Sequence, residues 1–286
     1  MSGALPRSNA LRRVLAVGMT TLVASACSLV DLGYLGPPGG GGEAGADAIG
    51  AGADATADGL LADAASATDA SDCPGRAGPP PVRVGDFCID RTEVTYGQYQ
   101  EFLAADDLAG LVQPPECAWN DSFLPEAGFV QAPDKPVVQI DWCDAYAYCA
   151  WAGKRLCGRV GGGSLPIGSI DNPELDQWFA ACSQRGARAF PYGDAFVAER
   201  CRDGSGEKSS VAAGSLPTCE GGFPGVFDLS GNAWEWQDVC DGDLCACRGG
   251  SWLHTGNAVG CAFAAVNFLP DRRLRQADIG FRCCSP

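Results

Sequence analysis

The sequence predicts an α+β domain with much irregular backbone, held together by disulfides. Three observations support this fold class. Short segments with helix-capping residues and apolar stripes come first, and turns alternating with short strand patterns follow. The chain contains 39 glycines and 19 prolines, which favour turns over long regular elements. It also contains 16 cysteines, enough for an extensive disulfide framework.

The first 26 residues have the pattern of an export signal. Three arginines form a basic region, and residues 14–23 form an apolar run that is too short to span a membrane. An Ala-Ser-Ala tripeptide precedes Cys27. It fits ordinary signal cleavage, and it also fits a lipoprotein whose Cys27 is acylated. We expect a lipid anchor at Cys27 and a place in the cell envelope, with soluble secretion to the periplasm or beyond as the alternative.

Residues 27–81 are expected to form a disordered tether. Between residues 43 and 72 there are seven acidic residues, no basic ones and mostly small side chains otherwise. Such a segment has too little apolar surface to offset its ordering entropy. Residues 82–286 then remain as one domain of ordinary size, large enough for a core of its own.

The charge balance narrows the classes of partner. The formal net charge is −15, which argues against nucleic acid because phosphates require a basic face. An acidic surface is compatible with divalent cations or basic peptides as partners.

The cysteine count points to an oxidising compartment. Without Cys27 there are fifteen cysteines and no C-x-x-C pair, so disulfides are favoured over zinc. Cys245, Cys247 and the Cys283-Cys284 pair are the places where a zinc site would have to form. Because the number is odd, at least one cysteine is left unpaired within the chain, and we expect this to be Cys73 in the tether.

The N-terminal part of the domain predicts a strand followed by a helix. Residues 82–89 alternate apolar and polar side chains, as a half-buried strand does. Thr95 is suited to cap a helix, and Gln98 stands three residues later, which is the pattern of a capping box.

Two further helices are expected. The first covers residues 142–152, with Asp141 as its N-cap and Gly153 as its stop signal. The second begins at Asn172-Pro173, because proline is favoured at the first helical position, and continues to about Gln184.

Residues 225–236 (GVFDLSGNAWEW) contain a turn that could hold a metal ion. Asp228 and Glu235 flank the tight turn at residues 230–232. Their oxygens, together with carbonyls of the turn, could enclose a hard cation such as calcium. In the alternative interpretation, Asp228 bonds turn amides and Glu235 pairs with an arginine. The residue types alone leave both interpretations open.

Six segments together resemble the formylglycine-generating enzyme family, also called the sulfatase-modifying-factor domain. The resemblance covers residues 82–284 and implies a sulfatase-modifying-factor fold, distantly similar to C-type lectin domains. The segments are residues 88–95 (CIDRTEVT), 147–156 (AYCAWAGKRL), 190–193 (FPYG), 225–236, 248–252 (RGGSW) and 280–283 (GFRC).

The resemblance implies several site residues. A structural Ca²⁺ would be held by Asp228, the carbonyls of Gly231 and Ala233, and Glu235. Two disulfides of the family correspond to the pairs Cys149–Cys283 and Cys182–Cys261.

The same resemblance implies that the catalytic thiols are missing. In active members two cysteines shortly after the Gly-Gly-Ser-aromatic signature bind copper, and with dioxygen they oxidise a substrate cysteine to formylglycine. The corresponding positions here are His254 and Val259. His254 could replace one copper ligand beside Cys261, or it could be a loop histidine that hydrogen-bonds its own turn. His254 is the single histidine of the chain. The chain therefore cannot supply the several histidine ligands of the iron site in the related sulfoxide synthases.

We therefore expect an exported, lipid-anchored domain that has lost copper catalysis. It would act as a binding or scaffolding module for a peptide, a glycan or an envelope protein, with Trp236 and Trp252 as possible walls of a groove. The alternative is a metal- and dioxygen-dependent oxidase of cysteine in exported proteins, with His254 and Cys261 as an altered copper site.

Overall fold

The computed structural model describes residues 73–126 and 129–286. The expected signal peptide, Cys27 and the tether up to residue 72 lie outside the described residues. The described helices are all too short or too polar to cross a bilayer.

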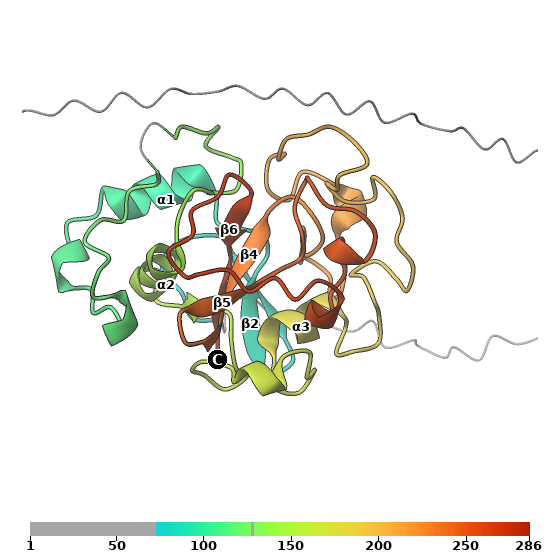
Figure 1. Ribbon diagram of the computed structural model, residues 1–286, viewed down its shortest axis with the longest axis horizontal. Coiled ribbons are helices and arrows are strands. Elements are labelled where there is room, and N and C mark those ends of the chain that lie inside the picture. The colour runs from blue at the N-terminus through green and yellow to red at the C-terminus, as the bar shows by residue number, and fades with distance from the viewer. Residues whose placement is uncertain (1–72, 127–128) are drawn as a thin grey trace, which may run out of the picture. The chain divides into compact units, whose positions relative to one another are not determined.

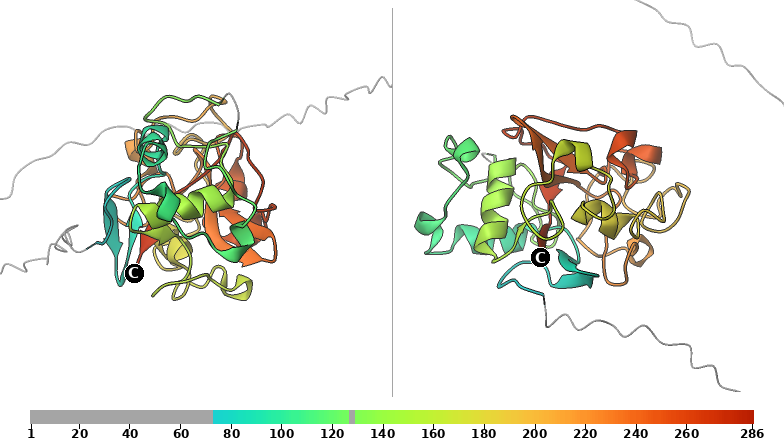
Figure 2. Two further views of the ribbon diagram at one scale, coloured as in Figure 1. Left: turned by 90° about the vertical axis from the view of Figure 1, so that its left-hand side faces the viewer. Right: turned by 90° about the horizontal axis from the view of Figure 1, so that it is seen from below.

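One sheet has four short antiparallel strands in the order β1-β2-β7-β3. They are β1 (Pro81–Val84), β2 (Phe87–Asp90), β3 (Arg155–Leu156) and β7 (Cys283–Ser285). Figure 2 shows the C-terminus close to the β1–β2 hairpin, in keeping with the pairing of β2 with β7. The single strand expected at residues 82–89 is wrong. Gly85 has a φ of +64°, which favours glycine, and it turns the segment into a hairpin.

The second sheet has the order β5-β4-β6 (Figure 1). β4 (Trp234–Asp241) pairs antiparallel with β5 (Leu244–Arg248) and parallel with β6 (Ile279–Phe281). The register of β4 and β5 shifts between Trp236 and Cys240. Arg282 is the single residue between β6 and β7, so the chain passes through it from one sheet to the other.

The first two predicted helices are confirmed, including their caps. α1 (Tyr96–Leu103) begins with a capping box in which Thr95 and Gln98 bond each other's backbone amides. α2 (Trp142–Trp151) has the same arrangement between Asp141 and Asp144. Figure 1 shows both helices on one flank of the second sheet.

The third predicted helix begins later than expected. α3 (Gln177–Cys182) is capped by Asp176, whose side chain accepts a hydrogen bond from the amide of Phe179. The preceding residues form a turn instead, because the carbonyl of Asn172 accepts from the amide of Asp176 at 2.8 Å. Short 3₁₀ turns connect the rest of the chain: η2 (Leu108–Gly110), η3 (Pro115–Cys117), η4 (Ile167–Ser169), η5 (Pro217–Cys219), η6 (Gly256–Val259) and η7 (Phe263–Ala265).

Seven disulfides link these elements, and they include both pairs implied by the family resemblance. The pairs are Cys73–Cys88, Cys117–Cys143, Cys149–Cys283, Cys157–Cys284, Cys182–Cys261, Cys201–Cys219 and Cys240–Cys245. The expectation that Cys73 is unpaired is wrong, because its bond to Cys88 ties residues 73–81 to the domain. Among the described cysteines Cys247 is the free one. Among the described residues these bonds leave one thiol, that of Cys247, which is too few for a zinc site built on cysteine.

Candidate functional site

The loop after β5 is shaped by two glycines. Gly249 and Gly250 have φ values of +85° and +70°, and a Cβ at Gly250 would lie 2.6 Å from the carbonyl oxygen of Ala258. This close approach turns the chain so that Ser251 is buried and His254 is half-buried. The amide of His254 donates to the carbonyl of Ser251 at 2.9 Å.

The side chain of His254 is held by a short chain of hydrogen bonds. Its Nδ1 lies 2.8 Å from Oγ of Ser251, and this hydroxyl donates to the carboxylate of Asp278 at 2.6 Å. Because the hydroxyl proton is directed to Asp278, Nδ1–H of His254 donates to Oγ. Burial lowers the pKa of His254, although Asp278 opposes the shift. The neutral ring thus keeps Nε2 as a free acceptor and packs edge-on against Trp234 at 4.9 Å.

In the part of the chain that the structure describes, no free thiol accompanies His254. Cys261 is fully buried and bonded to Cys182, so a thiolate copper pair of His254 and Cys261 is wrong. The expectation of a loop histidine that hydrogen-bonds its own turn agrees with the geometry. Cys247 is also unsuited to metal binding, because burial raises the pKa of its thiol well above the usual value.

Arg248 fastens this loop to α3. Its Nη1 lies 2.7 Å from Asp171 and 2.9 Å from the carbonyl of Cys261, and its Nη2 bonds Asp176. The prediction that Trp236 and Trp252 form the two walls of a groove is wrong for Trp236, which is fully buried and belongs to the core.

Glu235 of β4 forms a buried ion pair with Arg282. Nη2 and Nε of Arg282 lie 2.7 Å from the two carboxylate oxygens, and Nε1 of Trp178 donates to Oε2 at 2.7 Å. Burial disfavours the charge of Arg282, but Glu235, Glu93 and Asp228 together outweigh burial and raise the pKa of the guanidinium. The alternative in which Glu235 pairs with an arginine is therefore present in the structure.

Asp228 and Glu93 add two more buried carboxyl groups. Oδ2 of Asp228 accepts from the amide of Gly214 at 2.5 Å. Its Oδ1 and both oxygens of Glu93 have no amide, hydroxyl or guanidinium donor, and the two carboxyl groups lie within hydrogen-bonding reach of each other. Burial raises the pKa of Asp228 to about 6. Burial and the neighbouring Asp228 raise the pKa of Glu93 well above its usual value.

Glu93 was not assigned a role from the sequence, although it lies in the segment 88–95. Its neighbourhood is set by backbone pairing far along the chain. The amide of Val94 donates to the carbonyl of Phe281 at 3.0 Å, which brings Glu93 to the cluster of Asp228, Glu235 and Arg282. A single sequence contains no signal for that contact.

The Sulfatase-modifying factor enzyme 1-like domain family matches residues 53–285. The chain belongs to this family. It is 30% identical over 277 residues to the Bos taurus protein named inactive C-alpha-formylglycine-generating enzyme 2, with 76% of this chain and 83% of that protein covered. The resemblance seen in the sequence and the predicted fold class are thus confirmed.

Other members of the family have names that imply activity. The Bos taurus formylglycine-generating enzyme is 29% identical over 137 residues, which cover 41% of this chain and 30% of that enzyme. The hercynine oxygenase of Mycolicibacterium smegmatis is 26% identical, with 60% and 47% covered. Among solved structures, PvdO from Pseudomonas aeruginosa aligns with a TM-score of 0.47 and 21% identity over 69% of this chain and 79% of that one.

The residues of the sulfatase-modifying-factor signature in this chain suit calcium better than copper. Copper does not fit, since none of the described cysteines offers a thiolate beside His254. Calcium fits better, because Oδ1 of Asp228 has no donor and Oε1 of Glu235 has only one. In the described ranges no three His, Cys, Asp or Glu side chains converge for a metal. A calcium ion would therefore need the carbonyls of Gly231 and Ala233 as well.

Proposed function

We propose that this sulfatase-modifying-factor-like domain is an exported, lipid-anchored binding module without copper-thiolate catalysis. The observation that carries the proposal is the Cys182–Cys261 disulfide, which removes the cysteine nearest to His254 from metal chemistry. Val259 occupies the position of the second catalytic thiol and is buried. The relative that is 30% identical over most of the chain also has the word inactive in its name.

A structural calcium ion at Asp228 and Glu235 is part of this proposal. When bound, the ion would supply positive charge to a buried cluster that has three carboxyl groups and one guanidinium. Asp228 and Glu235 would contribute carboxylate oxygens, and Gly231 and Ala233 would contribute backbone carbonyls. Arg282 already holds Glu235 in place.

An assay for cysteine oxidation tests the loss of catalysis. The purified protein is loaded with Cu(I), washed, and incubated in air with a cysteine-containing peptide, and an active formylglycine-generating enzyme serves as the positive control. We expect no retained copper and no change in the mass of the peptide. Turnover of the peptide that disappears in the His254→Ala variant would instead support the alternative, an oxidase of cysteine in exported proteins.

The lipid anchor rests on the signal pattern of residues 1–26 and on Cys27. Replacing Cys27 by serine removes the thiol that would be acylated but leaves an ordinary cleavage site. Fractionation of cells should find the unaltered chain with the membranes and the C27S variant in the soluble fraction. Equal distribution of the two proteins would contradict lipidation and favour plain secretion.

A further inference from the structure

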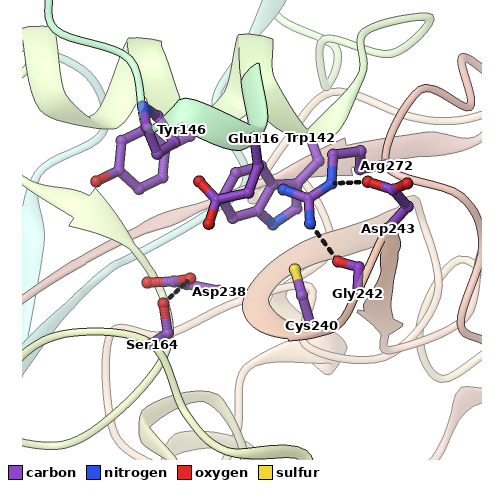
Figure 3. A pocket seen from close by; sticks show the side chains of 10 residues that line it. Glu116, Trp142, Tyr146, Ser164, Asp238, Cys240, Gly242, Asp243 and Arg272 are labelled. Atoms are coloured by element: carbon purple, nitrogen blue, oxygen red, sulfur yellow. Dashed lines mark hydrogen bonds and ion pairs between the residues drawn. The ribbon is translucent and has the colours of Figure 1, made fainter. Parts of the chain in front are cut away.

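A cavity of about 480 Å³ lies between α2 and the β4–β5 hairpin (Figure 3). Its volume is in the range of pockets that hold small ligands or single side chains. The residues that carry its chemistry are Glu116, Trp142, Tyr146, Asp238, Asp243 and Arg272.

The cavity has an excess of negative charge. Glu116, Asp238 and Asp243 face a single guanidinium, that of Arg272. Arg272 is already engaged: its Nε lies 3.3 Å from Asp243, it donates to the carbonyl of Gly242, and it lies over the ring of Trp142 at 5.2 Å. Figure 3 shows the pair of Arg272 and Asp243 on one side of the cavity, away from Asp238. Among the described residues Asp238 and Glu116 therefore form no ion pair, although the charges of Arg155 and Arg272 act to lower the pKa of Asp238.

Asp238 is the unusual member of this set. It is only 6% exposed, and its sole side-chain hydrogen bond comes from Oγ of Ser164 to Oδ1 at 2.6 Å. Neither lysine nor arginine forms an ion pair with it within the described residues. Burying a carboxylate without a partner is costly, and burial raises the pKa of Asp238. Its Oδ2 is left as an acceptor that faces the cavity.

Tyr146 completes the acceptor set. Its ring stacks on Trp142 at a centroid distance of 5.2 Å, so the hydroxyl is held at the cavity. The pKa of Tyr146 is raised by burial first, and then by Asp238 and Glu116. The hydroxyl is thus influenced by the same two carboxyl groups. Figure 3 shows all three side chains in the lining of the cavity.

We propose that this cavity binds an organic cation with N–H donors, namely a lysine ammonium or an arginine guanidinium group. Oδ2 of Asp238 would accept one N–H, Glu116 would add charge at the rim, and Tyr146 would contribute its hydroxyl oxygen and its ring. The inference names a ligand class for the proposed binding role and rests on that role.

Other cations fit less well. A metal ion lacks a convergent set of ligands, since no three acidic, histidine or cysteine side chains meet at a point in the part of the chain that the structure covers. A quaternary ammonium group would leave Oδ2 of Asp238 without a donor, and Trp142 already carries Arg272 on its ring. An N–H donor therefore matches the cavity best.

Calorimetric titration of the purified domain tests the inference. The ligands are acetyl-Gly-Lys-Gly-amide, acetyl-Gly-Arg-Gly-amide and, as the uncharged control, the same peptide with norleucine. n-Butylammonium separates a free amine from a peptide as the source of the cation. We expect the charged ligands to bind, more weakly at high salt, and the norleucine peptide not to bind. Tighter binding of the peptides than of n-butylammonium identifies a peptide as the ligand.

Variants show whether the cavity is the site. Asp238→Asn keeps the shape and the bond from Ser164 but removes the charge, and we expect binding to weaken about tenfold or more. Glu116→Gln changes an exposed side chain and should weaken binding without affecting the fold. Asp194→Asn makes the same charge change at an exposed residue outside the cavity lining and should bind as the wild type does.

The inference is overturned if the lysine peptide binds no better than the norleucine peptide, or if Glu116→Gln and Asp238→Asn bind as tightly as Asp194→Asn. Either result leaves the copper assay untouched, so failure of this inference and failure of the proposed loss of catalysis are distinguishable.

Discussion

Glu93, Asp228 and Glu235 are buried around one guanidinium, that of Arg282. The bidentate bond satisfies Glu235, but the other two carboxyl groups have oxygens without donors. Uncompensated buried charge destabilises a fold strongly. A proton on Glu93 or Asp228, or a cation bound beside Asp228, would relieve the repulsion.

Calcium should therefore stabilise the protein through Asp228. In thermal unfolding, millimolar CaCl₂ should raise the Tm of the wild type above its value in EDTA. A ligand present at about 100 times its Kd adds roughly 2.7 kcal/mol. Asp228→Asn should remove most of the rise, whereas Asp194→Asn should retain it. A calcium response that is identical in both variants would place the ion elsewhere.

The roles of individual residues could be predicted only in part from the sequence. The proposed loss of both copper thiols depends on the identities of His254 and Val259, which can be read from the sequence once the family resemblance is recognised. The position of Glu93 beside Asp228 could not be predicted, since it depends on backbone hydrogen bonds between distant segments, such as that from Val94 to Phe281. Asp228 and Glu235 were both identified, but the sequence could not decide between calcium and an arginine, and the structure shows the arginine bound to Glu235.

At the scale of elements, the start of α2 combines a helix cap with a shared cation. Asp141 and Asp144 both lie against Arg275, whose Nη2 is 2.7 Å and 3.0 Å from their carboxylate oxygens. One positive charge faces two buried carboxyl groups. Burial, followed by the neighbouring Asp141, raises the pKa of Asp144 to about 7.

This arrangement predicts a pH dependence of stability. Between the ordinary pKa of 3.8 and about 7 the folded protein holds a proton on Asp144 that the unfolded chain has released. The free energy of unfolding should therefore fall as the pH rises through this window, by roughly 1–3 kcal/mol from this group. Denaturant titrations at several pH values should show a smaller fall for Asp144→Asn, which cannot titrate there. Parallel pH profiles for the two proteins would contradict the shift.

Helices and strands were predicted most accurately where the residues that determine their ends are close together in the sequence. α1 and α2 were predicted with their N-caps, because the residues that cap a helix lie within four positions of each other. α3 was placed too early, because proline at position 173 is a valid helix start, but Asp176 caps the helix instead and also binds Arg248. The hairpin at Gly85 was missed, although the alternation changes phase there: Val82 and Val84 are followed by Phe87 and Ile89, with Gly85 and Asp86 between them.

On the scale of the whole molecule, disulfides connect segments that no local pattern relates. Cys149–Cys283 and Cys157–Cys284 span 134 and 127 residues, and they tie α2 and the segment after β3 to the C-terminal strand β7. The family resemblance implied two of the pairs. The others could not be deduced from fifteen cysteines, and Cys73 was wrongly expected to be the unpaired one.

The same framework excludes the altered copper site. Since Cys182 and Cys261 are bonded and buried, and Cys247 is buried as a neutral thiol, no described thiol can reach His254 as a thiolate. The cation site proposed in the cavity beside α2, in contrast, does not involve His254 or Val259.

Disulfide mapping tests this account most directly. The mature protein is alkylated in the native state, alkylated with a second reagent after denaturation, digested without reduction and analysed by mass spectrometry. We expect Cys182 and Cys261 in one linked peptide, and Cys247 modified only by the second reagent. Native alkylation of Cys261 would show a free thiol beside His254 and contradict the loss of copper-thiolate chemistry.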